Sequence, residues 1–189
     1  MERSIGLFDT CEMTAVYYFA FGANMNSAVL RRRGIAVLSR EPARLRGHRL
    51  VFDLAGIPWV EPAFASIVPD PEYDVYGVLY RLAPDQLDRV NSYEGPGYSF
   101  IEVEVEGERS GIKRTSTYRA KRSSSGLRPS RRYLRVLCEG ARENGLPPSY
   151  IRGLDAHPSV HVPVLSGIVE IGIGLFETFV QLFGRRRPC

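Results

Sequence analysis

The stretch VYYFAFGANMN, residues 16–26, constrains the fold more than any other part of the chain. Its aromatic and β-branched residues are typical of a strand, and the Gly-Ala-Asn that follows leads into a segment, residues 27–33, that can form a helix. Such a junction leaves backbone N–H groups without partners and places the positive end of a helix dipole behind them. The pattern favours a site for a carboxylate or another anion, with a simple chain reversal as the alternative.

The composition fits one soluble domain. The 189 residues are 44% hydrophobic and 24% charged, close to the usual globular mixture. The formal net charge of +4 comes mainly from arginines, with runs at residues 31–33, 131–132 and 185–187. No nucleic-acid-binding motif accompanies these runs, so we expect no nucleic acid partner and interpret the runs as solvated faces.

Cysteine and histidine, three residues each, lack the spacing of a disulfide framework or a metal site. We therefore predict neither a metal nor a disulfide. Residues 1–14 contain acidic side chains and no continuous apolar stretch, so they do not resemble a secretory signal. A reducing, cytoplasmic location is the expectation.

The middle of the chain carries strand and helix patterns, with strands in the majority. We expect strands at residues 44–52, 63–68, 75–81, 98–106 and 115–119, and helices at 84–93, 131–144 and 150–156, the last capped by Ser149. A Gly- and Pro-rich loop at 55–62 and a Ser-rich linker at 121–130 lie between them. The predicted organisation is an extension (1–14), one α+β domain (15–156) and an apolar tail (157–189).

Glu94 is the candidate catalytic side chain. It lies where the helix predicted at 84–93 gives way to Gly-Pro-Gly, between Tyr93 and Tyr98. A carboxylate that is partly desolvated among aromatic rings has a raised pKa, which makes it a better base near neutral pH. A solvent-facing glutamate in a turn is the alternative interpretation.

Six motifs in order resemble the γ-glutamylcyclotransferase family over residues 15–156. They are YFAFGAN (18–24), ASIV (65–68), VYGVLY (75–80), YEG (93–95), GY leading into IEV (97–103) and GARENGLP (140–147). The ENGLP run is similar to the branch that contains γ-glutamylcyclotransferase proper rather than the glutathione-specific branch. The resemblance implies a small mixed β-barrel with flanking helices.

The same resemblance implies an enzyme that converts a γ-glutamyl amide, a γ-glutamyl-amino acid or γ-glutamylamine, into 5-oxoproline and a free amine. The resemblance also implies that no metal or organic cofactor is needed, and it implies a link to glutathione metabolism. Because the α-amine attacks its own γ-carbonyl, no nucleophilic side chain is required. By resemblance, Glu94 is the general base. The residues implied in substrate binding are Tyr18, Phe19, Ala20, Phe21, Gly22, Ala23 and Tyr133.

Two positions depart from the family's Tyr-Gly-Ser-Asn pattern, because Phe21 and Ala23 both lack a hydroxyl. The backbone N–H groups of the turn are unaffected by both changes. A site without these hydroxyls favours a more apolar γ-glutamyl amide or slower turnover. We also expect Gly22 to adopt a backbone shape or close approach that a Cβ would obstruct.

Two other functions stay open: a non-catalytic member of the fold that binds a small molecule or a protein, and a biosynthetic enzyme that removes a γ-glutamyl protecting group. The tail is apolar over residues 162–183, but Glu170, Glu177 and Gln181 interrupt it, which argues against a membrane span. We expect the tail to fold back over the barrel. Self-association, as in a homodimer, and contact with a membrane surface are the alternatives.

Overall fold

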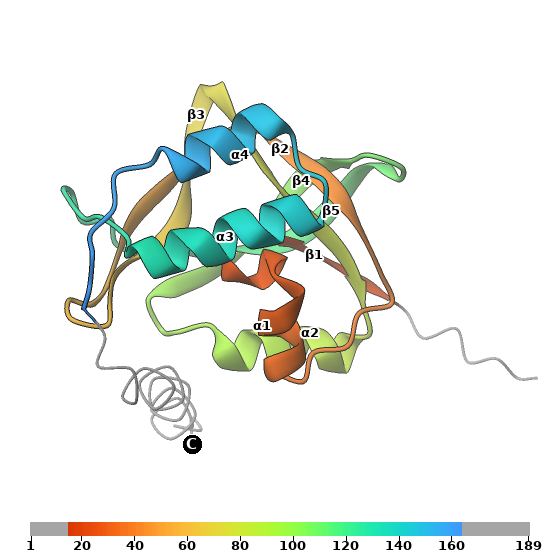
Figure 1. Cartoon of the computed structure of the whole chain (residues 1–189). Coiled ribbons are helices and arrows are strands. Elements are labelled where there is room, and N and C mark those ends of the chain that lie inside the picture. Colours follow the sequence, from red (N-terminus) through yellow and green to blue (C-terminus); the bar gives the residue numbers. More distant parts are fainter. Residues whose placement is uncertain (1–14, 164–189) are drawn as a thin grey trace, which may run out of the picture.

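Five strands close into a barrel in the computed structural model, which describes residues 15–163 (Figure 1). The strands are β1 (Val16–Ala20), β2 (Ser39–Ile57), β3 (Glu61–Leu82), β4 (Tyr98–Gly107) and β5 (Gly111–Ala120), in the order β1-β3-β2-β4-β5. Neighbours are antiparallel except β1 and β5, which pair in parallel and close the barrel. The predicted mixed β-barrel with helices is confirmed.

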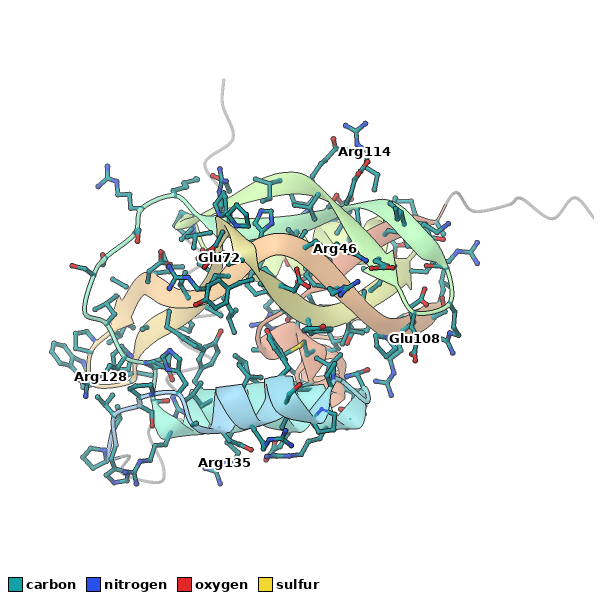
Figure 2. The ribbon with its side chains drawn as sticks, turned by 90° about the horizontal axis from the view of Figure 1, so that it is seen from above. Arg46, Glu72, Glu108, Arg114, Arg128 and Arg135 are labelled. Carbon is teal, nitrogen blue, oxygen red and sulfur yellow. The ribbon has the colours of Figure 1, made fainter. Side chains whose placement is uncertain are left out.

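Strand β4 shows how the alternating pattern determines the fold. Val105 is fully buried and Ile101 and Val103 pack against the core, whereas Glu102 and Glu104 between them are exposed. β4 pairs with β5 along its whole length, and β5 begins at Gly111, earlier than the strand predicted at 115–119. Charged side chains of this part of the barrel, including those of Arg114 and Glu108, point outward in Figure 2.

The prediction of separate strands at residues 63–68 and 75–81 was wrong, because both belong to β3. The ladder with β2 steps from the pair Arg46–Asp74 to the pair His48–Pro69, which leaves residues 70–73 opposite Gly47. Gly47 has a φ of +66°. Pro71 lies in this bulge, where no ladder hydrogen bond is needed. The expected loop at 55–62 is likewise shorter, since β2 continues to Ile57.

The helices occupy the predicted places. They are α1 (Ser27–Arg32), α2 (Pro84–Tyr93), α3 (Arg131–Glu143) and α4 (Pro148–Asp155), and a 3-10 turn, η1 (Ala23–Met25), precedes α1. Ser149 does not cap α4, because the helix already begins at Pro148, a residue whose missing N–H is harmless in a first turn. α3 and α4 lie together on one side of the barrel (Figures 1 and 2).

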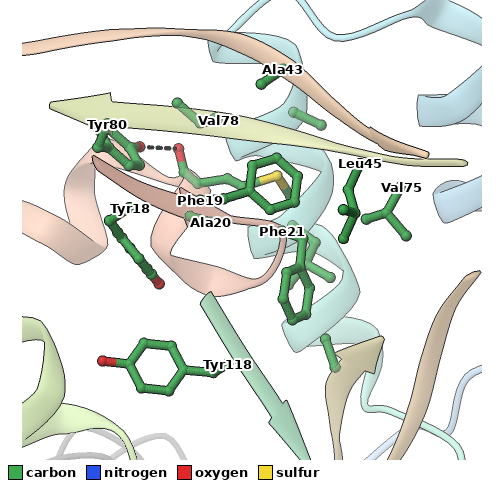
Figure 3. Packing of buried hydrophobic residues seen from close by; sticks show 14 of the residues in the cluster. Tyr18, Phe19, Ala20, Phe21, Ala43, Leu45, Val75, Val78, Tyr80 and Tyr118 are labelled. Carbon is green, nitrogen blue, oxygen red and sulfur yellow. Dashed lines mark hydrogen bonds between the residues drawn. The ribbon is translucent and has the colours of Figure 1, made fainter. Parts of the chain in front are cut away.

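The hydrophobic core fills the barrel and continues to α3. Figure 3 shows its aromatic part around β1, with Tyr18, Phe19, Phe21, Tyr80 and Tyr118. Within residues 15–163, no helix has the length and apolar character needed to cross a membrane. The predictions made for residues 1–14 and 164–189 lie outside the described residues.

Helix α3 supports the turn that follows β1. A Cβ on Gly140 would lie 2.7 Å from the backbone nitrogen of Asn26, so only glycine allows α3 to approach this closely. The side chain of Asn144 donates a hydrogen bond to the carbonyl of Met25 at 2.9 Å. The turn between β1 and α1 is therefore held by contacts from a distant helix.

Candidate active site

A cavity of about 350 Å³ lies between the turn after β1, the α2–β4 connection and the β2–β3 hairpin. Six of the eight predicted site residues line it, namely Tyr18, Phe21, Gly22, Ala23, Glu94 and Tyr133. Phe19 and Ala20 do not line the cavity; they are fully buried in the core, where the ring of Phe19 packs 6.3 Å from that of Phe21. The alternation of side chains along β1 accounts for Phe19, which points to the face opposite that of Tyr18.

Glu94 enters the cavity from the end of α2. It is the C-cap residue, and its extended backbone (φ −80°, ψ 130°) turns the chain out of the helix. Its side chain is only 17% exposed. This burial raises the pKa of Glu94, an effect that the nearby Arg33 and a hydrogen bond from Asn24 partly oppose. Glu94 therefore has the character of a base that titrates closer to neutral pH than an ordinary glutamate.

Asn24 connects the polar groups of the cavity. Its Nδ2 donates to Oε1 of Glu94 at 3.0 Å and to the hydroxyl of Tyr18 at 2.8 Å. Its Oδ1 accepts from Nη1 of Arg33 at 2.7 Å. Nη1 of Arg33 also lies 4.0 Å from Oε1 of Glu94, and the guanidinium group lies 5.0 Å from the centre of the Tyr93 ring. With both ends of its amide engaged, Asn24 fixes the position of the Glu94 carboxylate.

Asn24 and Arg33 were not among the site residues predicted from the sequence. Asn24 belongs to the motif on which the resemblance rests, and a short polar residue directly after the Gly-Ala turn was the available signal. For Arg33, the interpretation of the arginine run as a solvated face was wrong. Arg31 and Arg32 are exposed, but the Arg33 side chain is only 16% exposed and reaches back to Asn24.

The turn after β1 offers backbone donors. Among the described residues, no acceptor takes a hydrogen bond from the backbone N–H of Gly22 or Ala23. The first N–H groups of α1 are already used, since that of Ser27 donates to Glu143 and that of Ala28 to Asn26. Backbone donors for the predicted anion site are therefore left in the turn itself, because those of Ser27 and Ala28 at the start of α1 are engaged.

The expectation that a Cβ would be obstructed at Gly22 was wrong. Gly22 has a φ of −112°, and an added Cβ would lie 3.5 Å from the Tyr133 hydroxyl and 3.8 Å from Cβ of Ala65. These are ordinary contact distances. Only a side chain larger than alanine would extend from this position into the cavity.

Two tyrosines flank Ala65 in the wall of the cavity. The hydroxyl of Tyr98 donates to the carbonyl of Ala65 at 2.7 Å, and the hydroxyl of Tyr133 accepts from its N–H at 3.3 Å. Burial raises the pKa of both tyrosines, so both stay protonated. Because its interaction with Ala65 uses only a lone pair, the Tyr133 hydroxyl keeps its proton for a ligand.

No group of three or more His, Cys, Asp or Glu residues within residues 15–163 is placed to hold a metal ion. The described thiol, that of Cys138 in α3, is buried, and burial raises its pKa to about 12. Cys138 does not line the cavity. The proton-accepting group that the cavity presents at neutral pH is thus the Glu94 carboxylate.

Known proteins share this architecture. The model of the AIG2-like family matches residues 74–154. The gamma-glutamyl cyclotransferase gliK of Aspergillus fumigatus is 30% identical over 192 residues, covering 87% of this chain and 70% of that protein. The protein of the same name from Claviceps purpurea is 32% identical over 162 residues, covering 79% and 72%. A solved structure of a gamma-glutamyl cyclotransferase has a TM-score of 0.71 at 26% identity, covering 85% of this chain and 99% of that one. The chain therefore belongs to the AIG2-like, gamma-glutamyl cyclotransferase family.

Proposed function

We propose that this protein is an enzyme that converts a γ-glutamyl amide into 5-oxoproline and a free amine, with Glu94 as general acid and base. One observation carries the proposal: a mostly buried carboxylate with a raised pKa shares a cavity with unused backbone N–H groups of Gly22 and Ala23. Cyclisation of a γ-glutamyl amide needs a base and a set of donors for negative charge, and it needs no nucleophilic side chain. The cavity supplies both.

In the proposed mechanism, Glu94 accepts a proton from the α-ammonium group of the substrate. The neutral nitrogen then attacks the γ-carbonyl carbon, which forms the ring C–N bond and places negative charge on the carbonyl oxygen. Breaking the bond to the leaving nitrogen restores the carbonyl. Glu94 carries two protons in turn from the ring nitrogen to the leaving nitrogen, so the products are 5-oxoproline and an ammonium ion. No water is consumed and no electron is gained or lost.

The remaining groups of the cavity bind and orient the substrate in this proposal. The N–H groups of Gly22 and Ala23 hold its anionic groups, and the Tyr133 hydroxyl donates a further hydrogen bond. Tyr18 accepts from Asn24 and so keeps its own proton to donate. Asn24 acts through Glu94, whose carboxylate it holds in place.

The test is release of 5-oxoproline from a panel of γ-glutamyl amides. We expect Glu94→Gln and Glu94→Ala to lower turnover by about two to four orders of magnitude, the usual effect of losing a general base, while substrate binding largely persists. Glu108→Gln is the matched control, because Glu108 is exposed and lies outside the cavity. Near-normal turnover by Glu94→Gln would eliminate the assignment, and a wild-type protein that binds these amides without turning them over would indicate a non-catalytic member of the fold.

A further inference from the structure

The cavity has one polar side and one apolar side. Of the described residues that line it, Arg33 and Glu94 are the only charged ones, and Asn24 holds them together. The apolar side comes from the β2–β3 hairpin and from Pro96, two residues after Glu94 in the α2–β4 connection. Its apolar lining residues are Leu54, Ala55, Ile57, Phe64 and Pro96.

The polar side is the deeper one. Tyr18 and Asn24 are 4% and 5% exposed, whereas Ile57 is 37% exposed. Ala55 and Pro96 are exposed as well. The α-amine and γ-carbonyl of a substrate must reach Glu94 for the proposed reaction. The part of the amide that departs then extends along the apolar side, toward the rim.

A carboxylate on the departing amine would find no cation among the described residues of that side. The guanidinium of Arg33 already donates to Asn24, lies near Glu94 and covers the ring of Tyr93. The unused N–H groups of Gly22 and Ala23 serve the glutamyl part in the proposed mechanism. A second negative charge would therefore lose water against apolar side chains without a compensating charge, which is unfavourable.

We infer that the substrate's leaving amine is hydrophobic and carries no carboxylate, so that the site prefers γ-glutamyl amides of apolar amines to γ-glutamyl-amino acids. This inference rests on the proposed function and specifies its substrate class. The apolar side chains at residues 54, 57 and 64 select the amine, and the polar side carries out the same chemistry on any γ-glutamyl group. The cavity volume, about 350 Å³, is at the lower end of the range for small-molecule sites, which suits an amine of moderate size.

A matched pair of substrates tests the inference directly. γ-Glutamyl-phenethylamine and γ-glutamyl-phenylalanine differ only in the carboxylate of the amine part. We expect kcat/KM to be about tenfold or more higher for the phenethylamine amide. γ-Glutamyl-ethylamine, which lacks the ring, should also be poorer than the phenethylamine amide by about tenfold or more.

Variants at the rim provide a second test. Ile57→Arg places a cation on the apolar side at a partly exposed position, so it should raise kcat/KM for γ-glutamyl-phenylalanine and reduce the preference about tenfold. Ile112→Arg is the matched control, because Ile112 is a 73% exposed isoleucine of β5 that does not line the cavity. It adds the same charge and should leave the preference unchanged. Melting temperatures of both variants establish that they are folded.

The outcomes separate this inference from the proposed function. Equal kcat/KM values for the two matched amides, or a preference for γ-glutamyl-phenylalanine, overturn the inference and leave the proposed function standing. If no amide releases 5-oxoproline, the proposed function fails, and binding to the Glu94→Gln protein decides the inference. If the Glu94→Gln protein binds γ-glutamyl-phenethylamine about tenfold more tightly than γ-glutamyl-phenylalanine, the inference is supported. Equal binding of the two amides overturns it.

Discussion

The two sides of the cavity differ in what holds them in place. The turn after β1 is supported from outside itself: Tyr80 donates to the carbonyl of Asn24 at 3.0 Å, and α3 presses against the turn at Gly140. The end of the β2–β3 hairpin is held near the start of α3, where Glu61 accepts from the backbone N–H of Ser130 at 2.8 Å and Arg132 donates to the carbonyl of Val60 at 2.9 Å. The groups proposed for the chemistry thus lie on the deeper side, whereas Ile57, proposed to select the amine, is partly exposed at the rim.

This contrast predicts opposite responses to mutation. Changes on the polar side should affect every γ-glutamyl amide alike, because they act on Glu94 or on the glutamyl part. Changes on the hairpin should alter the ranking of amides and leave the pH dependence unchanged, since they contact only the departing amine. A mutation that did both would show that the two sides are not separate.

The largest effect after loss of Glu94 itself is expected for Asn24→Ala. It removes a hydrogen bond to a carboxylate, an interaction typically worth about 1.5–3 kcal/mol, so kcat should fall about ten- to hundredfold. The hydrogen bond from Asn24 lowers the pKa of Glu94, and without it that pKa rises further. Because the base acts in its ionised form, the acidic limb of the pH–rate profile should move to higher pH. An unmoved limb would show that Asn24 is only structural, and Gln86→Ala on α2, whose amide lies outside the cavity, is the control.

Arg33→Gln should lower turnover less than Asn24→Ala, because Asn24 holds the carboxylate directly by a hydrogen bond, but it shifts the pKa of Glu94 in the same direction. The guanidinium lies 4.0 Å from the carboxylate and favours its ionised form, so its loss raises the pKa of Glu94. We expect a roughly tenfold fall in kcat/KM at neutral pH, partly recovered in alkaline buffer. Arg32→Gln, one residue earlier and exposed, should leave the profile as it is. Equal effects of the two variants would contradict the placement of Arg33 in the site.

The same arginine run shows what the sequence could not determine. Charge alone assigns Arg31, Arg32 and Arg33 to one class, and only the end of α1 at Arg32 places the third side chain next to Asn24. That contact depends on where the chain turns, which is a tertiary property. The Glu94 position, by contrast, was predictable, because a helix ending at Gly-Pro-Gly is a local signal.

Among the barrel strands, too, local pattern predicted one element well and another poorly. The alternation of β4 sufficed to predict it almost to the residue, whereas residues 63–68 and 75–81 were predicted as two strands that the structure joins in β3. Pro69 and Pro71 lie between them, and whether a proline ends a strand depends on the partner strand. Here β2 pairs with β3 on both sides of the bulge, and no local pattern contains that pairing.

The substitution Glu94→Gln should raise the thermal stability of the protein at neutral pH, although it lowers turnover. The pKa of Glu94 is higher in the folded protein than in the unfolded chain, so the folded state binds that proton more tightly. Its contribution to the free energy of unfolding is therefore favourable at low pH and is lost as pH rises from the ordinary glutamate range through the folded pKa. Glu94→Gln should melt above the wild type at pH 7.5, by roughly 2–4 °C for each kcal/mol removed. The difference should vanish near pH 4, and a variant that melts below the wild type at pH 7.5 would contradict the raised pKa.

The smallest effect is expected for Ala23→Ser, which adds a hydroxyl at the boundary between the two sides. Ala23 lines the cavity and is half-buried, so a serine fits there. A tyrosine in place of Phe21, which is 5% exposed, would bury its hydroxyl. One neutral hydrogen bond contributes about 0.5–1.5 kcal/mol, which limits any gain in kcat/KM to about tenfold. If the backbone N–H groups of Gly22 and Ala23 hold the substrate, the gain should be well below that limit and equal for γ-glutamyl-phenethylamine and γ-glutamyl-phenylalanine. A larger gain confined to the phenylalanine amide would mean that the turn also contacts the departing amine, and the division of the cavity into a chemical side and a selective side would then be wrong.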